Sequence, residues 1–228
     1  MKKFFTLAIC AMAVLFASCE KNEPSLDKDN PSSGGENDHE YVDLGLSVKW
    51  ATCNVGANKP EEYGDYFAWG ETEPKSTYDW STYKWSNGDN ANLTKYCYDS
   101  WYGIVDNKTV LDLSDDAARA NWGGSWRMPT KAEQDELREN CTWTWTTQNG
   151  VNGYKVTSKK NGNSIFLPAA GCRNDSSLNY AGSNGDYRSS SLYTLAPDFA
   201  CGLYFGSGYV GWGISYRFVG FTVRPVCQ

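Results

Sequence analysis

Cysteine thiols and carboxylates are the groups of this 228-residue chain that could do chemistry, because histidine is almost absent. The single histidine, His39, lies in a stretch rich in acidic residues, Pro, Ser and Gly that we expect to lie outside the folded domain. Ser-His-Asp and Cys-His nucleophiles need an imidazole as their base, and histidine metal sites need imidazole ligands. The sequence therefore predicts neither an enzyme of those types nor a histidine metal centre.

The remaining reactive groups form no recognisable site. No CxxC pair occurs, which argues against zinc, and although disulfides are allowed outside the cytoplasm, the sequence does not select among their pairings. Asp and Glu are plentiful, but no two are marked as a catalytic pair, and charged surface is their expected role. We predict no catalytic residue, no metal ligand and no cofactor. The domain cysteines are Cys53, Cys97, Cys141, Cys172, Cys201 and Cys227.

The last quarter of the chain, residues 171–226, has a composition unlike the rest. It contains no Lys, Glu, Gln, Met or His, whereas residues 41–170 contain ten Lys and seven Glu. Gly, Ser, Asn, Asp and Tyr take their place, and these residue types are typical of a paratope. Tyr provides contact area at a low entropic cost, while Ser, Gly and Asn provide adaptable hydrogen bonds. This composition indicates a recognition surface.

The N-terminus has the features of an export signal. Two lysines precede an apolar run over residues 4–16, which is too short to span a membrane comfortably. The sequence FASC at residues 16–19 resembles a bacterial lipobox, so we predict a lipoprotein signal peptide over 1–18 and lipidation of Cys19. Acyl chains on Cys19 would then hold the protein to a membrane. The alternative is an ordinary cleaved signal followed by a chance cysteine.

Residues 20–40 contain seven acids, two lysines and little apolar surface. Such a segment cannot bury enough apolar surface to fold, so residues 19–40 are predicted to be a lipidated, disordered acidic tether. Residues 41–228 then form one domain. The chain has a formal net charge of −6, and nucleic acid is therefore excluded as a partner, because phosphate binding needs a basic surface.

The residue pattern predicts an α+β fold with two short helices and many short antiparallel strands. Most of these strands follow the helices in the sequence. Residues 41–56 indicate a strand pair and residues 63–69 another strand, whereas residues 70–110 are rich in loops and aromatic residues. Ser114 is expected to cap a helix over 117–121 that ends at Gly123. Thr130 and Glu133 form a capping box that begins a second helix, reaching about residue 140.

After the second helix, β-type residues predict strands over 141–147, 154–158 and 164–169. Asn-Gly pairs at 149–150, 152–153 and 161–162 are expected to form the turns. In the last quarter, residues 203–205, 209–212 and 221–226 predict three further strands joined by Gly-rich turns.

Three motifs carry a resemblance to a known family: GGSWRMPTKAE at 123–133, LPAAG at 167–171 and GFTVRPV at 220–226. Through them, most of residues 41–228 resembles the Bacteroidetes lipoprotein domain of the Fibrobacter succinogenes major paralogous type. That domain is similar to the C-type lectin fold, including its formylglycine-generating enzyme and major tropism determinant versions. The resemblance implies a C-type-lectin-like fold in which the terminal motif closes the sheet. We expect Arg224 to be buried beside an acid, because an unpaired internal charge is costly.

The resemblance also implies a ligand face. Some proteins of this fold are diversified by retroelements that mutate the adenines of Asn codons, which cannot yield Lys, Glu, Gln, Met or Trp. The absence of Lys, Glu, Gln and Met from residues 171–226 fits this rule, whereas Trp212 departs from it and His is absent although the rule allows it. A simple compositional bias explains the same absence. Cys201, Gly202, Gly213 and Val219 are also candidate exchangeable positions, and Cys201 is expected to be unpaired. The candidate ligand-binding residues are Tyr180, Asn184, Asp186, Tyr187, Arg188, Asp198, Phe199, Gly206, Tyr209, Gly211, Trp212, Ile214, Ser215, Tyr216 and Phe218.

We therefore expect an outer-membrane lipoprotein, facing the cell surface or the periplasm, that binds a protein or glycan ligand on another cell, a phage or a host surface. Its aromatic residues would be anchors, and Asp186, Arg188 and Asp198 would provide charge complementarity. Replacing Trp212 or Arg188 by Ala should then abolish binding and leave the melting temperature nearly unchanged. Two alternatives stay open: a formylglycine-generating-like enzyme, and a structural or fimbrial surface component. The calcium signatures of sugar-binding lectins are absent, and residues 73–75 (EPK) match them only in part.

Overall fold

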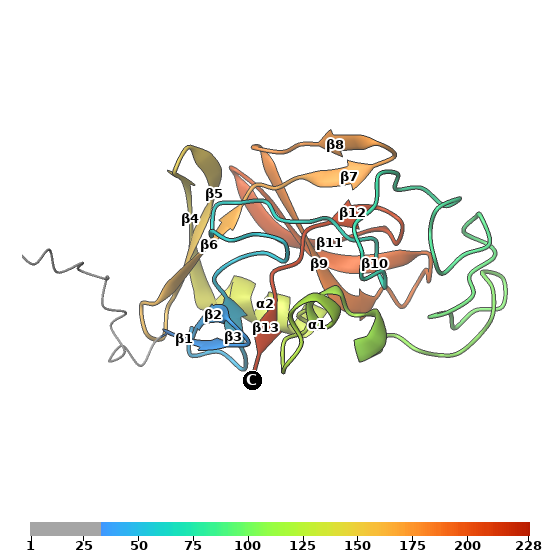
Figure 1. Ribbon diagram of the computed structural model, residues 1–228, viewed down its shortest axis with the longest axis horizontal. Coiled ribbons are helices and arrows are strands. Elements are labelled where there is room, and N and C mark those ends of the chain that lie inside the picture. The colour runs from blue at the N-terminus through green and yellow to red at the C-terminus, as the bar shows by residue number, and fades with distance from the viewer. Residues whose placement is uncertain (1–32) are drawn as a thin grey trace, which may run out of the picture. The chain divides into compact units, whose positions relative to one another are not determined.

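Antiparallel strands make up most of the regular secondary structure in the computed structural model, which describes residues 33–228 (Figure 1). The strands lie in four small sheets and are accompanied by two α-helices, so the predicted mixed α+β class is confirmed. The predicted signal peptide, the predicted lipidation site Cys19 and the predicted tether up to residue 32 lie outside the described residues. No helix within residues 33–228 is long and apolar enough to cross a membrane.

The first sheet joins the two ends of the domain. Its order is β1 (Ser33–Glu36), β2 (His39–Val42), β3 (Lys49–Ala51) and β13 (Val226–Cys227). β13 pairs antiparallel with β3, which places Val226 opposite Trp50. The C-terminal motif therefore closes onto the beginning of the domain, as the family resemblance implied.

The predicted boundary of the disordered tether, residue 40, is wrong, because β1 and β2 already belong to the folded unit. The His39 ring stacks on Trp122 at a centroid distance of 3.8 Å. The indole nitrogen of Trp126 donates a hydrogen bond of 2.9 Å to the carbonyl oxygen of Glu36. These acidic residues fold because aromatic side chains from the first helix region cover them, which their own composition does not reveal.

The two helices begin at defined caps. α2 (Lys131–Asn140) starts at Thr130 with the predicted capping box, in which Glu133 accepts a hydrogen bond from the Thr130 backbone. α1 (Ala117–Trp122) is capped by Asp116 and not by the predicted Ser114, which lies in a 3₁₀ turn (Leu113–Asp115). Asp116 also accepts a bond of 2.8 Å from the Met128 backbone, so a tertiary contact selects this cap.

The middle sheet contains β4 (Cys141–Gln148), β5 (Val151–Ser158) and β6 (Ser164–Pro168), close to the predicted ranges. Asn149-Gly150 forms the β4–β5 turn, with positive φ at both residues. Asn152-Gly153 was predicted as a turn but lies within β5, where Gly153 is opposite Thr146 and Pro168. Residues 63–69 form no strand and contribute a single bridge, between Phe67 and Phe221.

The last quarter builds two sheets. One has the order β11 (Tyr209–Tyr216), β10 (Phe199–Gly206) and β9 (Asn184–Leu192), and the other has β12 (Gly220–Phe221), β7 (Cys172–Asn174) and β8 (Ser177–Asn179). The sequence predicted neither β9 nor the β7–β8 pair. The single strand expected over 221–226 is instead divided between β12 and β13, which belong to different sheets.

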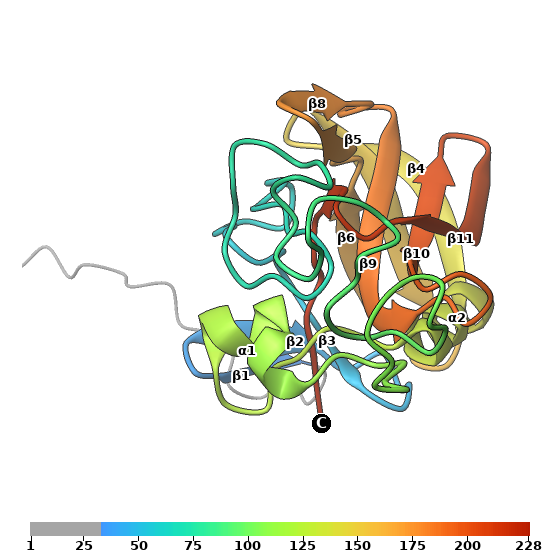
Figure 2. The same cartoon turned by 90° about the vertical axis from the view of Figure 1, so that its right-hand side faces the viewer.

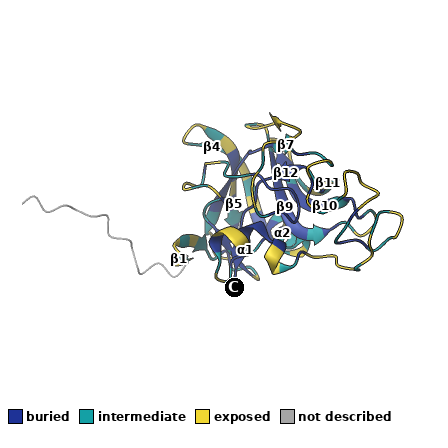
Figure 3. Cartoon of the chain, turned by 45° about the vertical axis from the view of Figure 1, so that its right-hand side comes forward, coloured by how far each residue is buried: buried dark blue, intermediate teal, exposed yellow. Residues whose placement is uncertain are grey.

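A hydrophobic core lies between α2, the middle sheet and the β9–β10 pair, and it includes Leu137, Val156, Leu203 and Phe205. Figure 3 shows buried residues concentrated in these elements and exposed residues along the loops. Arg224 is buried as predicted, but its neighbour is not an acid. Its guanidinium donates to the Asn54 side chain and to the carbonyl oxygens of Ala51, Thr52 and Phe166.

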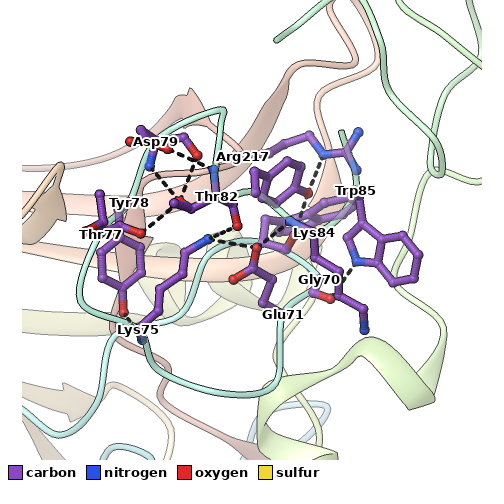
Figure 4. Close-up of polar contacts among 12 residues, drawn as sticks. Gly70, Glu71, Lys75, Thr77, Tyr78, Asp79, Thr82, Lys84, Trp85 and Arg217 are labelled. Carbon is purple, nitrogen blue, oxygen red and sulfur yellow. Dashed lines mark hydrogen bonds and ion pairs between the residues drawn. The ribbon is translucent and has the colours of Figure 1, made fainter. Parts of the chain in front are cut away.

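Residues 70–110 are a long loop region held by two buried charged groups (Figure 4). The Glu71 carboxylate accepts hydrogen bonds from the Lys75 ammonium and the Lys84 backbone, at 2.9 and 2.8 Å. Arg217 donates to the Tyr83 hydroxyl at 2.8 Å and to the Tyr96 carbonyl oxygen at 3.2 Å. Arg217 thereby attaches the loop region to the segment that follows β11.

Candidate binding surface

β11 is the outer strand of its sheet, and Figure 2 shows it beyond β10 and β9. Alternation places Val210, Trp212, Ile214 and Tyr216 on one face, and the residues between them on the other. Four of its large side chains are exposed, by 37–54 %. We call this set the β11 surface: Trp212, Ile214 and Tyr216 on the first face, together with Tyr209 on the other face at the start of the strand.

A groove of about 570 Å³ lies where α2 begins beside β11. The Trp212 ring forms part of its wall, and the Lys131 ammonium lies over that ring at 4.5 Å from the centroid. Lys131 also forms an ion pair with Asp135 one helical turn later. We call this the Trp212 groove. Its lining residues are Thr109, Val110, Thr130, Lys131, Ala132, Asp135, Ser191, Leu192, Tyr193, Thr194, Cys201 and Trp212.

A second aromatic group lies at the end of β11, around Tyr216. The Phe199 and Phe218 rings stack with Tyr216 at centroid distances of 4.3 and 5.5 Å. Trp80, from the 70–110 loop region, packs edge-on against Phe218 at 5.1 Å. The structure therefore brings three predicted candidates together and adds Trp80, which the sequence prediction missed. The aromatic richness of that loop region was the only signal for it.

Arg188 is the main correction to the predicted ligand face, because its side chain is fully buried. Its guanidinium donates to the carbonyl oxygen of Val219 at 2.6 Å and more weakly to that of Tyr216 at 3.3 Å. The same group lies over the Phe221 ring at 3.7 Å. A side chain enclosed in this way holds backbone segments together and is not presented to a ligand.

Four further candidates are also buried and do not belong to the exposed face. Tyr187 donates its hydroxyl to the Pro168 carbonyl oxygen at 2.8 Å. Burial raises the pKa of Asp186 to about 6. Asp198 accepts a bond from Asn90, and Gly206 lies against the Tyr209 ring. The family resemblance placed Asp186 and Asp198 on the ligand face, but both side chains are buried.

The remaining candidates lie around the β11 surface. Asn184 donates to the Tyr209 hydroxyl at 3.0 Å, and Tyr180 is exposed in the turn after β8. Ser215 is half-buried on β11. A Cβ atom at Gly211 would meet no atom within 4 Å, whereas one at Gly213 would lie 3.0 Å from the Tyr204 ring. Among the other exchangeable candidates, Cys201, Gly202 and Val219 are buried.

The thiols have the environment of structural cysteines. All six domain cysteines are free. Burial raises the pKa of five of them, to about 11 for Cys141 and about 12 for Cys172, so these thiols stay protonated at neutral pH. Residues 33–228 contain no group of three or more His, Cys, Asp or Glu placed to hold a metal ion.

Comparisons of the chain with protein-family models, with curated proteins and with solved structures find no match.

Proposed function

We propose that this chain is a binding protein that recognises a protein or glycan ligand through the β11 surface and the Trp212 groove. The observation that carries the proposal is the row of exposed apolar side chains on one edge strand. Contiguous exposed apolar patches mark interaction sites, and Trp and Tyr are enriched among the residues that dominate binding energy. The groove beside Trp212 adds a concave site with convergent polar groups.

We also propose that the α+β domain is C-type-lectin-like. The union of the two chain ends in one sheet supports this, as does the placement of the three resemblance motifs. Trp126 and Met128 of the first motif are buried, as are Ala169 of the second and Val223 of the third. Each motif thus contributes to the frame of the domain. Lipid anchoring through Cys19, outside the cytoplasm, belongs to the same proposal.

Diversification by a retroelement would act on the β11 surface in this proposal. Exchange of Trp212, Ile214 or Tyr216 would change an exposed side chain, while the strand's pairing with β10 holds the backbone. Gly211 has open space for a side chain. Buried candidates such as Arg188 would instead be fixed by the core.

The binding proposal is tested by measuring how the purified protein binds an immobilised glycan array and a displayed peptide library. Trp212→Ala should weaken binding of any selected probe by at least about tenfold, because a Trp anchor of an interface is lost. Leu178→Ala is the control, since Leu178 is an exposed apolar residue on β8, outside the β11 surface. Equal effects of the two substitutions would reject the β11 surface as the site.

Diversification has a separate genetic test. We expect a near-copy of the coding region for residues 171–226 beside a reverse transcriptase gene, differing only at adenines. Without such a copy, the composition of this segment is ordinary loop variation, and the binding proposal stands on the β11 surface alone.

A further inference from the structure

A second concave site lies on another part of the domain, between residues 64–78 and β7. Its volume is about 500 Å³. We call it the Arg173 pocket. It shares no residue with the Trp212 groove. Its lining residues are Gly64, Asp65, Tyr66, Pro74, Lys75, Ser76, Tyr78 and Arg173.

The walls of the Arg173 pocket are held in place by hydrogen bonds. The Tyr66 hydroxyl donates to the Ala170 carbonyl oxygen at 2.6 Å, and the Tyr78 hydroxyl donates to the Tyr66 carbonyl oxygen at 2.6 Å. Tyr78 and Asp175 exchange two backbone hydrogen bonds of 2.9 Å, which join the loop to the end of β7. A ligand would therefore enter a preformed site, which lowers the entropic cost of binding.

Arg173 brings an uncommitted positive charge to this pocket. Its guanidinium lies over the Tyr66 ring at 5.3 Å from the centroid. Among residues 33–228, no hydrogen bond or ion pair is found for this guanidinium, although the side chain is half-buried. The buried Arg188 and Arg224, by contrast, donate to backbone carbonyl oxygens. A guanidinium fixed on an aromatic face with its donors free is suited to bidentate recognition of a carboxylate.

The other charged groups of the pocket narrow the ligand class. The Lys75 ammonium is paired with Glu71 at 2.9 Å and also donates to the Thr82 carbonyl oxygen, as Figure 4 shows. The Asp65 carboxylate lies against Gly56 and forms no ion pair within the described residues. A multiply charged anion such as phosphate would be repelled by Asp65. A single carboxylate with a hydrogen-bond donor nearby satisfies both Arg173 and Asp65.

We propose that the Arg173 pocket binds a small monocarboxylate that carries a hydrogen-bond donor a few atoms away. Arg173 takes the carboxylate, Asp65 accepts from the donor, and the Tyr66, Pro74 and Tyr78 side chains enclose the carbon frame. The donor is the hydroxyl of a sugar acid or the ammonium of a free amino acid. The site acts independently of the β11 surface.

Isothermal titration of the purified protein with glucuronate and with glycine tests this proposal. We expect saturable binding of one probe, weakened at least about tenfold by Arg173→Gln, because a charge-assisted pair is lost. Arg119→Gln is the matched control, since Arg119 is also half-exposed but does not line the pocket. Ser76→Trp should block the mouth of the pocket from an exposed position and abolish binding without changing a buried residue.

Asp65→Asn distinguishes the two ligand classes, a sugar acid and a free amino acid. It should weaken glycine binding about tenfold, because the ammonium loses its ionic partner, and leave glucuronate binding nearly unchanged, because an amide oxygen still accepts from a hydroxyl. The proposal is overturned if neither probe saturates the wild-type protein, or if Arg173→Gln and Ser76→Trp, both folded by circular dichroism, bind as the wild type does. This test of the Arg173 pocket is independent of the test of the β11 surface, because Trp212→Ala should not alter the binding of glucuronate or glycine.

Discussion

β9 and β11 flank β10 in one sheet, yet they distribute polarity in opposite ways. β9 reads NGDYRSSSL and is buried from Gly185 to Ser190. β11 reads YVGWGISY, contains no charged residue and exposes four large side chains. The polar strand is inside and the apolar strand is outside. Position in the sheet and the layers that cover it therefore decide burial here, and composition does not.

Several buried polar groups of β9 are hydrogen-bonded to backbone carbonyl oxygens of neighbouring segments, although the Arg188 Nε has no partner among the described residues. The Ser189 hydroxyl donates to the Cys201 carbonyl oxygen at 2.9 Å, and the Arg188 backbone nitrogen donates to the Thr222 carbonyl oxygen at 3.0 Å. Buried polar groups cost little when they are hydrogen-bonded. The apolar groups of β11 have no comparable cover among the described residues. The proposed role in recognition would account for their exposure, whereas the groups on β9 need only a structural role.

The strongest test of this contrast is Arg188→Ala. We expect the free energy of unfolding to fall by about 3–5 kcal/mol, because the change leaves a cavity and removes the donor to the Val219 carbonyl oxygen. Urea unfolding followed by tryptophan fluorescence measures it. Arg119→Ala, at a half-exposed position, should change stability by about 0.5 kcal/mol or less. A stable Arg188→Ala protein that lost ligand binding would return Arg188 to the ligand face.

A matched pair of glycines gives the next largest effect. A Cβ atom at Gly185 on β9 would lie 2.0 Å from the buried Phe205 ring, whereas one at Gly211 on β11 would meet nothing within 4 Å. Gly185→Ala should cost up to about 3 kcal/mol through overpacking, and Gly211→Ala should lie within about 0.5 kcal/mol of the wild type. Thermal melts of both variants measure the difference. Equal stabilities would mean that β9 is as open as β11.

The fold was predictable where local chemistry decides it. The capping box at Thr130 and the Asn149-Gly150 turn depend on neighbouring residues, and both are found as predicted. β9 was missed because its Ser and Gly residues have neither β-branching nor alternation, and only the layers around it make it a strand. The cap of α1 was predicted at Ser114 but is Asp116, because a distant backbone group, Met128 N–H, donates to the Asp116 carboxylate.

The residues of the candidate site were likewise predicted in part and missed in part. Trp212 and Tyr216 were selected from the composition of the last quarter, and both are exposed. Lys131 and Trp80 were missed because they reach the surface from elements far away in sequence. Arg188 was placed on the ligand face by the family resemblance, whereas its side chain is fully buried. A sequence shows which residue types are present, but not which of them the other elements cover.

Asp186 on the buried strand β9 makes the stability of the protein dependent on pH. Its folded pKa of about 6 lies above the ordinary value of 3.8, because burial disfavours the charged form. The native state therefore holds this proton more tightly than the unfolded chain does, and its stability contribution falls as pH rises from about 4 to 6. Relative to Asp186→Asn, which does not titrate, the wild type should lose roughly 1–2 kcal/mol across this range. Urea unfolding at pH 4, 5, 6 and 7 measures it. A constant difference between the two proteins would show that Asp186 is solvated like a surface residue.

The smallest expected effect is that of Ile214→Ser on β11. Ile214 is 37 % exposed, and its replacement removes apolar area that is partly in water already. Burial of apolar surface stabilises at about 25 cal/mol per Å² only for the area that leaves water, so the free energy of unfolding should fall by about 1 kcal/mol or less. Leu203→Ser on the adjacent β10 is the control, because Leu203 is buried on the same face of the sheet. It should destabilise by several-fold more, through both lost burial and an unpaired hydroxyl. A comparable loss of unfolding free energy at both positions would show that the β11 side chains are buried in the protein. They would then belong to the hydrophobic core and would not be free to contact a ligand.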